Sequence, residues 1–451
     1  MIRTHINNLI TFFLLLLLPG IIAAQDNDTN DDEPDYFDEN YLRYEDHLYK
    51  DSIKTVLLYR EGWDLSFPII DLNANDKLRL RFDVLDNEIH DYYYTIIHCN
   101  AEWKPSDLMP SEYIDGFTEN HIRDYEHSFN TLFDYVHYTV VFPNEDMKPV
   151  LSGNYIIMVY EDYDQENLVL TKRFCVVEPL VKIEPDIKQA TLIDLRKNSQ
   201  EVDFIINTRG LPVNDIFNDI KVKLRINNRW DNEISDLKPL FLKEDQLIYN
   251  YEVENVFAAG GEYRNFDIKS IRFQSEFIKD IIFERPYYHV YLTTCIPKPF
   301  RVYFFDHDLN GKYLVHIQEG DEDHIEADYV YVHFTLKYDA PLTDGNIYVF
   351  GQLSEWSFNN NNRMEYNFEK KAYTLTMLLK QGYYNYEYVF VKDGSTTADN
   401  TFIEGSHYET ENDYFIYVYF RNNSLRYDKL VGVAVKNTLK NELEINSYFK
   451  K

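Results

Sequence analysis

The chain has 451 residues, of which 76 are Asp or Glu and 45 are Lys or Arg, so its formal net charge is −31. This balance excludes nucleic-acid binding through the general surface and opposes adsorption to anionic lipid, because both need clustered basic residues. Hydrophobic residues make up 45% and aromatic residues 16% of the chain, which is enough to build folded cores over most of its length. The many Tyr and Phe residues favour β-structure.

The first 24 residues have the layout of a secretory signal. Arg3 precedes an apolar run from Leu9 to Ala24, which is followed by the polar Gln25. The run is shorter than the ~20 residues that span a bilayer, so we expect cleavage after Ala24 and an exported protein. No cysteine stands directly after the run, so we expect no lipid anchor. The alternative is an uncleaved membrane anchor.

A strongly acidic segment follows. Residues 26–46 contain ten Asp or Glu residues and one basic residue, Arg43. Such a segment buries too little apolar surface to fold alone, so we predict a flexible, solvated arm over residues 25–50. It is either a solubilising linker or an arm that docks on a basic partner surface. Residues 438–451 are interpreted as a C-terminal tail.

From residue 51 onward the pattern predicts an all-β protein of tandem immunoglobulin-like β-sandwich domains. Short apolar stretches recur, each bounded by Asp, Asn, Gly or Pro, and no helix longer than a turn or two is predicted. We place the domains at residues 51–178, 179–299 and 300–437. The strands predicted for the first domain are Thr55–Arg60, Leu65–Ile70, Lys77–Leu85, Tyr92–Cys99, His137–Phe142, Tyr155–Tyr160 and Leu168–Val177.

The same signals predict the strands of the other two domains. Asn310-Gly311 predicts a hairpin turn between Tyr303–Phe305 and Tyr313–Val315, because both residues tolerate positive φ. The strands predicted for the second domain are Glu201–Asn207, Ile220–Asn227, Gln246–Glu254, Ser270–Gln274 and His289–Thr294. The further strands predicted for the third are Tyr329–Leu336, Asn346–Gly351, Ala372–Leu379, Tyr383–Val391, Tyr414–Arg421 and Lys429–Val435.

The third domain carries one pattern of its own. In order it contains Gly351–Trp356 after a strand, then Met364, the strand Tyr373–Leu379, and Gly382–Tyr388. This order resembles the glycogen-binding type of carbohydrate module, which is an immunoglobulin-like sandwich. The resemblance implies a sugar site built from exposed aromatic platforms, for which Trp356, Tyr384 and Tyr386 are the candidates. The alternative is that Trp356 packs a loop onto the sandwich.

Motifs for catalysis, cofactors or metals are almost absent from the sequence. No phosphate-binding glycine motif, metalloprotease His-Glu pair, Cys-x-x-Cys or serine elbow occurs. The run Asp306-x-Asp308-x-Asn310-Gly311 matches the opening of a calcium loop, but Ile317 stands where the bidentate Glu is required, so we favour an ordinary acidic hairpin. The cysteines allow one disulfide at most, and buried thiols are the favoured interpretation for Cys99, Cys175 and Cys295.

The long segment Ala101–Tyr135 is a candidate contact surface. It is polar and aromatic together, and it is too long for a tight turn. Long ordered loops are uncommon and often functional, and aromatic side chains are frequent anchors at interfaces. The candidate partner contacts are Trp103, Tyr113, Phe117, Tyr125 and Phe129. The alternative is a loop that only closes one end of the sandwich.

Several strings together go beyond the fold class. They are His98–Trp103, Pro105–Leu108, Ser128–Thr131, Asn228–Asn232, Phe266–Ser270, Lys380–Tyr386, Glu404-Gly405 and Thr410–Tyr414. In this order and spacing the chain resembles the type IX secretion system plug protein family from about Thr55 to Val435. It departs from the family pattern at the acidic arm, and Ala259–Glu262 fits it only loosely.

The resemblance implies a non-enzymatic periplasmic protein that closes the periplasmic mouth of the large outer-membrane translocon barrel when no cargo is present. We therefore expect a monomer, peripheral to the inner face of the outer membrane, that works without catalytic residues, cofactors, metals, nucleic acid or a direct lipid anchor. Two alternatives stay open. One is a periplasmic or surface glycan-binding protein that uses the third domain; the other is a secreted glycoside hydrolase with an attached module, which the lack of a catalytic-sized domain disfavours.

Overall fold

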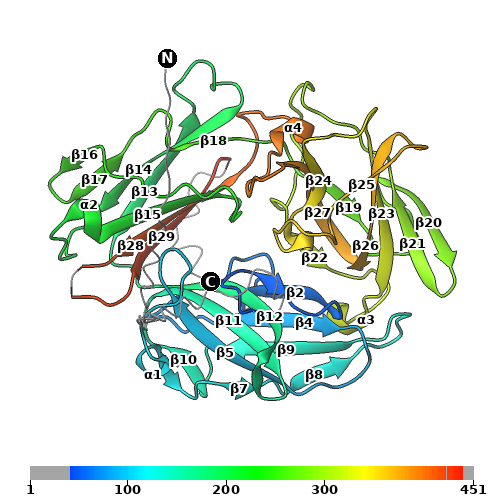
Figure 1. Ribbon diagram of the computed structural model, residues 1–451, viewed down its shortest axis with the longest axis horizontal. Coiled ribbons are helices and arrows are strands. Elements are labelled where there is room, and N and C mark those ends of the chain that lie inside the picture. Colours follow the sequence, from blue (N-terminus) through cyan, green and yellow to red (C-terminus); the bar gives the residue numbers. More distant parts are fainter. Residues whose placement is uncertain (1–40, 423, 440–451) are drawn as a thin grey trace, which may run out of the picture. The chain divides into compact units, whose positions relative to one another are not determined.

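The computed structural model describes residues 41–422 and 424–439 (Figure 1). The predicted signal, most of the acidic arm and most of the C-terminal tail lie outside these residues. From Leu42 onward the chain forms one compact unit. Its regular structure is nearly all β, as predicted, and its helices are single turns: α1 (Pro110–Tyr113), α2 (Ile216–Asp219), α3 (Asp323–Glu326), α4 (Thr401–Glu404) and the 3-10 turn η1 (Gln352–Ser354).

The first module is a β-sandwich with its own core. One sheet has the order β1 (His47–Leu48), β12 (Asp164–Val177), β11 (Gly153–Glu161), β5 (Tyr92–Cys99) and β7 (Asn120–His121), with β3 (Ile69–Asp71) parallel to β12. The facing sheet is β2 (Ile53–Arg60), β4 (Leu78–Val84), β9 (Val136–Phe142) and β8 (Asp124–His127). A small ribbon pairs β6 (Ile114–Gly116) with β10 (Met147–Pro149).

Alternation explains why these segments form strands. On β4, Leu78, Leu80 and Phe82 are completely buried in the core between the two sheets, whereas Arg79 and Arg81 are partly exposed. Successive side chains of a strand point to opposite faces, so this spacing turns one face of the sheet inward. The central strand β11 is buried on both faces along nearly its whole length: a sheet of another module covers its outer side at Ile156, and Leu42 and Tyr49 pack with Met158 and Tyr160.

The second module also has two sheets around one core. The first is β13 (Lys182–Gln189), β14 (Ser199–Asn207), β17 (Gln246–Tyr249) and β16 (Phe241–Lys243), with β18 (Val256–Ala258) beside β14. The second is β15 (Ile220–Ile226), β28 (Asp413–Phe420) and β29 (Lys429–Asn437). In Figure 1 the red strands β28 and β29 lie beside the green β15, so the end of the chain returns to complete this module.

The third module packs a five-stranded sheet against a smaller one. The larger sheet is β20 (Ile278–Glu284), β21 (Tyr287–Leu292), β23 (Tyr329–Lys337), β26 (Ala372–Lys380) and β25 (Glu365–Asn367). The smaller one places β27 (Gly382–Lys392) beside β19 (Arg264–Asp267), β22 (Tyr313–Val315) and β24 (Gly345–Phe350). The core between them is again continuous.

Strand pairing does not follow the predicted boundary between residues 299 and 300. β28 and β29 belong to a sheet of the second module, although their residues were assigned to 300–437. Conversely β19, β20 and β21 pair with strands of the third module, although they fall within 179–299. Local alternation identifies a strand but not its partner, because ladder hydrogen bonds form between segments far apart in sequence.

Several local predictions differ from the structure. Of Leu65–Ile70 only the last two residues form a strand, in β3, and of Gln246–Glu254 only the first four, in β17. Asn310 and Gly311 do have positive φ, at 51° and 79°, but Tyr303–Phe305 forms no strand, and β22 pairs with β27 instead. Ser270–Gln274 is a turn, in which the Ser270 hydroxyl accepts the N–H groups of two following residues. The end of the predicted flexible arm, residues 42–50, is packed on the first module: β1 pairs with β12, and the Asp46 carboxylate accepts the N–H of Arg173 at 2.7 Å.

Candidate interaction surfaces

A buried polar cluster joins the first module to the third. Asp83 on β4 accepts hydrogen bonds from His137 Nδ1 and Tyr329 OH, each at 2.6 Å, and pairs with Lys380 Nζ at 2.6 Å. Burial raises the pKa of Asp83, but the Lys380 ammonium and the His137 N–H outweigh burial and hold the pKa below its usual value. The charged pair therefore links strands 297 residues apart in the chain.

A second buried pair joins the second module to the third. Arg229, in the turn after β15, donates to Asp231 at 2.8 Å and to Glu387 on β27 at 3.2 Å. Its guanidinium also lies 5.0 Å from the ring centre of Phe350. Burial raises the pKa of Glu387 to about 7, against the opposing effect of Arg229. An ion pair and a cation–aromatic contact of the same arginine therefore hold the second module to the third.

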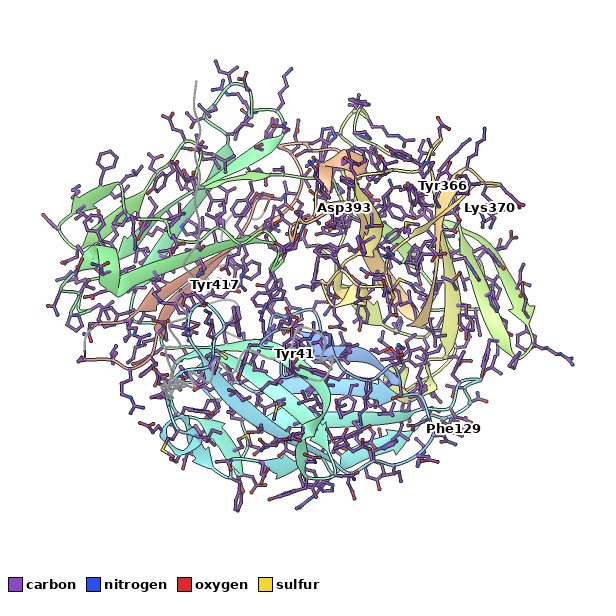
Figure 2. All side chains as sticks on the ribbon, in the orientation of Figure 1. Tyr41, Phe129, Tyr366, Lys370, Asp393 and Tyr417 are labelled. Atoms are coloured by element: carbon purple, nitrogen blue, oxygen red, sulfur yellow. The ribbon has the colours of Figure 1, made fainter. Side chains whose placement is uncertain are left out.

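The junction between the first and second modules is aromatic. The Arg173 guanidinium lies 4.8 Å from the centre of the Trp103 ring and 4.4 Å from that of the Trp230 ring. The Arg225 guanidinium lies 3.8 Å from the centre of the Trp230 ring. Tyr417 on β28, labelled in Figure 2, is buried in the same apolar cluster. Here the outer faces of two sheets pack directly on each other.

The turn 309–312 touches all three modules. The Lys312 ammonium donates to the carbonyl of Leu65 in the first module at 2.5 Å, and Asn310 donates to Asp413 in the second at 3.0 Å. Burial lowers the pKa of Lys312 to about 8. The positive φ of Asn310 and Gly311, which the sequence analysis assigned to a hairpin, instead shapes the point at which the modules meet.

The predicted partner contacts divide into two groups. Trp103 and Tyr113 are buried, at 7% and 4% exposure, so they serve the internal packing. Phe117, Tyr125 and Phe129 are exposed, at 65%, 40% and 64%, and stay available to a partner. The sequence pattern could not separate these groups, because the residues that cover Trp103 belong to another module.

Part of the long segment 101–135 is itself an internal contact. Phe129, labelled in Figure 2, donates its backbone N–H to the carbonyl of Ile325 in the third module at 2.9 Å. The Phe133 N–H donates to the Asp328 carboxylate at 3.1 Å, and the Phe133 ring stacks on Tyr287 with ring centres 3.8 Å apart. The segment therefore closes the first module against the third and leaves Phe129 on the outside.

The predicted glycan platforms are not open aromatic faces. Tyr384 and Tyr386 are each 2% exposed, and Tyr384 stacks between Phe266 and Tyr313 at 5.1 and 4.9 Å. Neither ring can offer a face to a sugar. Trp356 is half-buried in an aromatic cluster on the third module, which is the packing role that the sequence analysis kept as its alternative.

In the run that resembles the opening of a calcium loop, Asp306 to Gly311, the Asp308 carboxylate is engaged in hydrogen bonds within the protein. Asp308 accepts the N–H groups of Tyr263 and Asn310, both at 2.7 Å. Burial raises the pKa of Asp308 to about 7, and the nearby Glu262 acts in the same direction. Among the described residues, no three His, Cys, Asp or Glu side chains converge in a way that could hold a metal ion.

All three cysteines are free thiols. Cys99 and Cys175 are buried, and burial raises the pKa of each to about 12. Cys295 is partly exposed. The structure therefore agrees with the favoured interpretation of unpaired thiols, with Cys295 less covered than expected.

A surface that the sequence analysis missed lies on the third module. Phe300, Val302 and Phe304 are 99%, 92% and 80% exposed, although they occupy consecutive alternate positions. Val302 and Phe304 border a cavity of about 580 Å³ whose other walls include Phe277, Ile296 and Glu262. A signal for this surface exists in the sequence, since no Asp or Glu occurs between Arg285 and Phe305 in an otherwise acidic chain.

Comparisons with known proteins place the chain in a family. The family described as Type 9 secretion system plug protein 1st domain matches residues 53–178, which is the first module from β2 onward. A crystal structure of a hypothetical protein from Parabacteroides merdae ATCC 43184 is 36% identical, covers 88% of this chain and 100% of its own, and superposes with a TM-score of 0.86. No curated protein matches. In the described part of the chain no helix is long and apolar enough to cross a bilayer. By its first module, residues 53–178, the chain belongs to the type IX secretion system plug protein family.

Proposed function

We propose that this protein closes the periplasmic mouth of the outer-membrane translocon barrel of the type IX secretion system while no cargo occupies the pore. Family membership supports a role in that system. The single structural observation that carries the finer proposal is the set of buried junctions between the three modules. A protein that blocks a wide pore must be large and rigid, and these buried junctions hold the three modules together as one rigid body.

The free energy needed to open the junction between the first and second modules gives a measure of this rigidity. From the second module it buries Phe415, Tyr417, Tyr419, Leu430, Val433 and Val435 against the first. Burial of one such side chain is worth roughly 1.5–3 kcal/mol, so opening this junction alone costs about 10 kcal/mol or more. The ion pairs Asp83–Lys380 and Arg229–Glu387 hold the other two junctions. Separated modules are therefore a negligible fraction of the population.

The proposed role is steric and non-enzymatic, and the protein acts in the periplasm as a monomer. Cargo and plug compete for the same opening, so the plug leaves when cargo or a cargo carrier binds the barrel. An interface of standard size, about 1,600 Å², supports affinities from micromolar to picomolar, which allows reversible closure. The exposed Phe117, Tyr125 and Phe129 are candidate anchors for this contact.

Deletion of the gene tests the proposal. We expect the outer membrane to admit large solutes that the wild type excludes, and we expect the tagged protein to co-purify with the barrel from detergent-solubilised outer membranes. Restoring the intact gene should restore the barrier. Unchanged permeability, together with a barrel that purifies without this chain, would refute the role.

A further inference from the structure

The strand β26 has an open edge beyond its pairing with β25 (Figure 1). β26 pairs with β23 over its whole length, but on its other side β25 reaches only as far as Thr374. Just before β25 the chain is bound to the smaller sheet: Met364 is 3% exposed in the core and donates its backbone N–H to the Ile347 carbonyl at 2.8 Å. The residues Leu375–Leu379 therefore lie at an unpaired edge, which we call the 375–379 edge.

The backbone of the 375–379 edge carries free hydrogen-bonding groups. In an antiparallel pair, every second residue directs its N–H and C=O away from the partner strand. Within the described residues, no strand, turn or side chain makes a hydrogen bond to the backbone of Leu375–Leu379 on the side away from β23. Such a row of donors and acceptors is a template on which another extended chain can add as a strand.

A cavity of about 390 Å³ lies along this edge, and every residue from Leu375 to Lys380 lines it. Successive side chains of a strand point to opposite faces, so a cavity over one face would be lined by alternate residues only. This cavity therefore lies beside the edge, where the backbone is within reach. Its other walls include Leu48 and Lys54 of the first module and Asn359–Asn362 of the third. The edge is thus recessed between two modules, and we call this space the edge recess.

The walls of the edge recess are apolar and carry one unpaired cation. Leu375 and Met377 pack against the core of the third module but are only partly covered at this edge. Lys54 is partly buried, and in the part of the chain that the structure describes its ammonium makes no hydrogen bond or ion pair. Burial lowers the pKa of Lys54, and the opposing effect of Asp51 is smaller. An anionic group that entered the recess would therefore stabilise the charge of Lys54.

The other charged side chains that line the edge recess already have partners. Glu355 is the one carboxylate among the lining residues, and it pairs with Lys172 at 2.6 Å. Lys380, the other lysine of the recess, pairs with Asp83 at 2.6 Å. Among the described residues that line the recess, Lys54 is thus the charge that remains for a partner.

We propose that the 375–379 edge binds an extended segment of a partner polypeptide as an added β-strand, with apolar side chains on Leu375 and Met377 and a carboxylate on Lys54. Main-chain hydrogen bonds supply the affinity, and the side-chain contacts supply the selectivity. The inference does not depend on the proposed closure of the barrel. Failure of the edge to bind a peptide would leave that role standing, and unchanged outer-membrane permeability would leave this edge standing.

Two other occupants fit the observations less well. A small anion would satisfy Lys54 but would leave the backbone of the edge without partners. A second copy of this chain would have to bring a strand of a folded sheet into a recess between two modules, and two molecules of net charge −31 repel each other. A free extended segment enters the recess and satisfies the backbone and Lys54 together.

Fluorescence anisotropy with the full mature chain tests the proposal. The probes are three fluorescent heptapeptides of alternating Thr and Val, in which a single Glu replaces Thr at position 1, 3 or 5. We expect saturable binding of at least one probe, and binding about tenfold weaker in Lys54→Gln, because a charge-assisted hydrogen bond is lost. The matched control is Lys77→Gln, at an exposed lysine of the first module, which should bind as the wild type does. Absence of binding by all three probes would overturn the proposal.

A double-mutant cycle tests the pairing of the carboxylate with Lys54. Replacing the Glu of the best probe by Gln should weaken its binding to the wild type by about tenfold, because the same interaction is removed from the other side. The same replacement should weaken binding to Lys54→Gln by less than about twofold. Equal losses in the two proteins would refute the pairing with Lys54.

Hydrogen exchange and a change to the probe test strand addition itself. With the probe bound, exchange of the Leu375–Leu379 amides should slow, whereas exchange in the edge strand β16, Phe241–Lys243, should not change. Of two probes that are N-methylated at odd or at even residues, at least one cannot complete the ladder and should not bind. Parent-like binding of both would show that the carboxylate alone is held, and would contradict strand addition. Dimers that the probe dissociates in analytical ultracentrifugation would identify a second copy as the occupant and would also overturn the proposal.

Discussion

Replacing Lys380 by Met tests whether the charged pair holds the first and third modules together. Asp83 is 1% exposed, and its three partners all lie at 2.6 Å. Removing the ammonium leaves a buried carboxylate with only the neutral donors His137 and Tyr329. Breaking a buried pair in this way costs about 3–5 kcal/mol, because the remaining charge is no longer compensated. We therefore expect the free energy of unfolding of Lys380→Met to fall by that amount.

The assay is urea unfolding followed by tryptophan fluorescence and circular dichroism at pH 7. The matched control is Lys370→Met, at an exposed lysine of the same module that Figure 2 labels. It should change the free energy of unfolding by less than about 0.5 kcal/mol. The double variant Asp83→Asn/Lys380→Met removes both charges and should recover part of the loss. If Lys380→Met costs no more than Lys370→Met, the pair does not hold the junction and the reasoning fails.

The pH dependence adds a second readout for the same pair. In the wild type the pKa of Asp83 is lowered in the folded state, so its contribution is present above the ordinary carboxyl value of 3.8 and is lost as the pH falls through the folded value. Without Lys380, burial dominates and raises the pKa of Asp83, which reverses the sign. The stability gap between wild type and Lys380→Met should therefore narrow as the pH is lowered from 7 to about 4.

Three further predictions follow from single sites. Gly311→Ala should lower the free energy of unfolding by about 2–4 kcal/mol in the same urea assay, because Gly311 has a φ of +79° and an added Cβ would lie 2.4 Å from the Trp356 ring. The control is Gly394→Ala, where φ is also +79° but nothing lies within 4 Å of the added Cβ. It should lose only the backbone strain, about 1 kcal/mol. Burial raises the pKa of Glu262 to about 7, so its charge costs stability as the pH rises from 4.5 through 7, and Glu262→Gln should raise the melting temperature at pH 8 but not at pH 4. Iodoacetamide should label Cys295 alone in the native protein and all three cysteines after denaturation, as counted by mass spectrometry.

The strands could be predicted from the sequence because each carries its own periodicity. Tyr92–Cys99 is a strand with the predicted bounds, and β4, β9 and β12 begin or end within a few residues of theirs. The signal is local: alternate apolar side chains mark a face that another layer must cover. For the same reason the all-β class could be predicted. The module to which β28 and β29 belong could not, because their own residues do not indicate that β28 pairs with β15.

The candidate site was harder to predict than the fold, because exposure is a property of the assembled modules. Trp103 and Phe117 look alike in sequence, yet Trp230 covers the first and leaves the second in solvent. The reverse error occurred at Phe304, where the Asn310-Gly311 turn signal suggested a paired strand and the structure leaves the side chain 80% exposed. The ion pair between Asp83 and Lys380 could not be predicted from the sequence, because 297 residues separate the two side chains.

If the protein closes the barrel as proposed, its rigid junctions also constrain how it can be released. Opening the apolar junction between the first and second modules costs about 10 kcal/mol by the burial of its side chains, which leaves the open state populated at less than one part in a million. A displacing cargo cannot rely on so rare a state. Release must therefore act on the outer surface, by competition for exposed contacts such as Phe117 and Phe129 one at a time. Variants that weaken a junction, such as Lys380→Met, should then lower stability without speeding release, whereas Phe117→Ser should speed dissociation from the barrel without lowering stability.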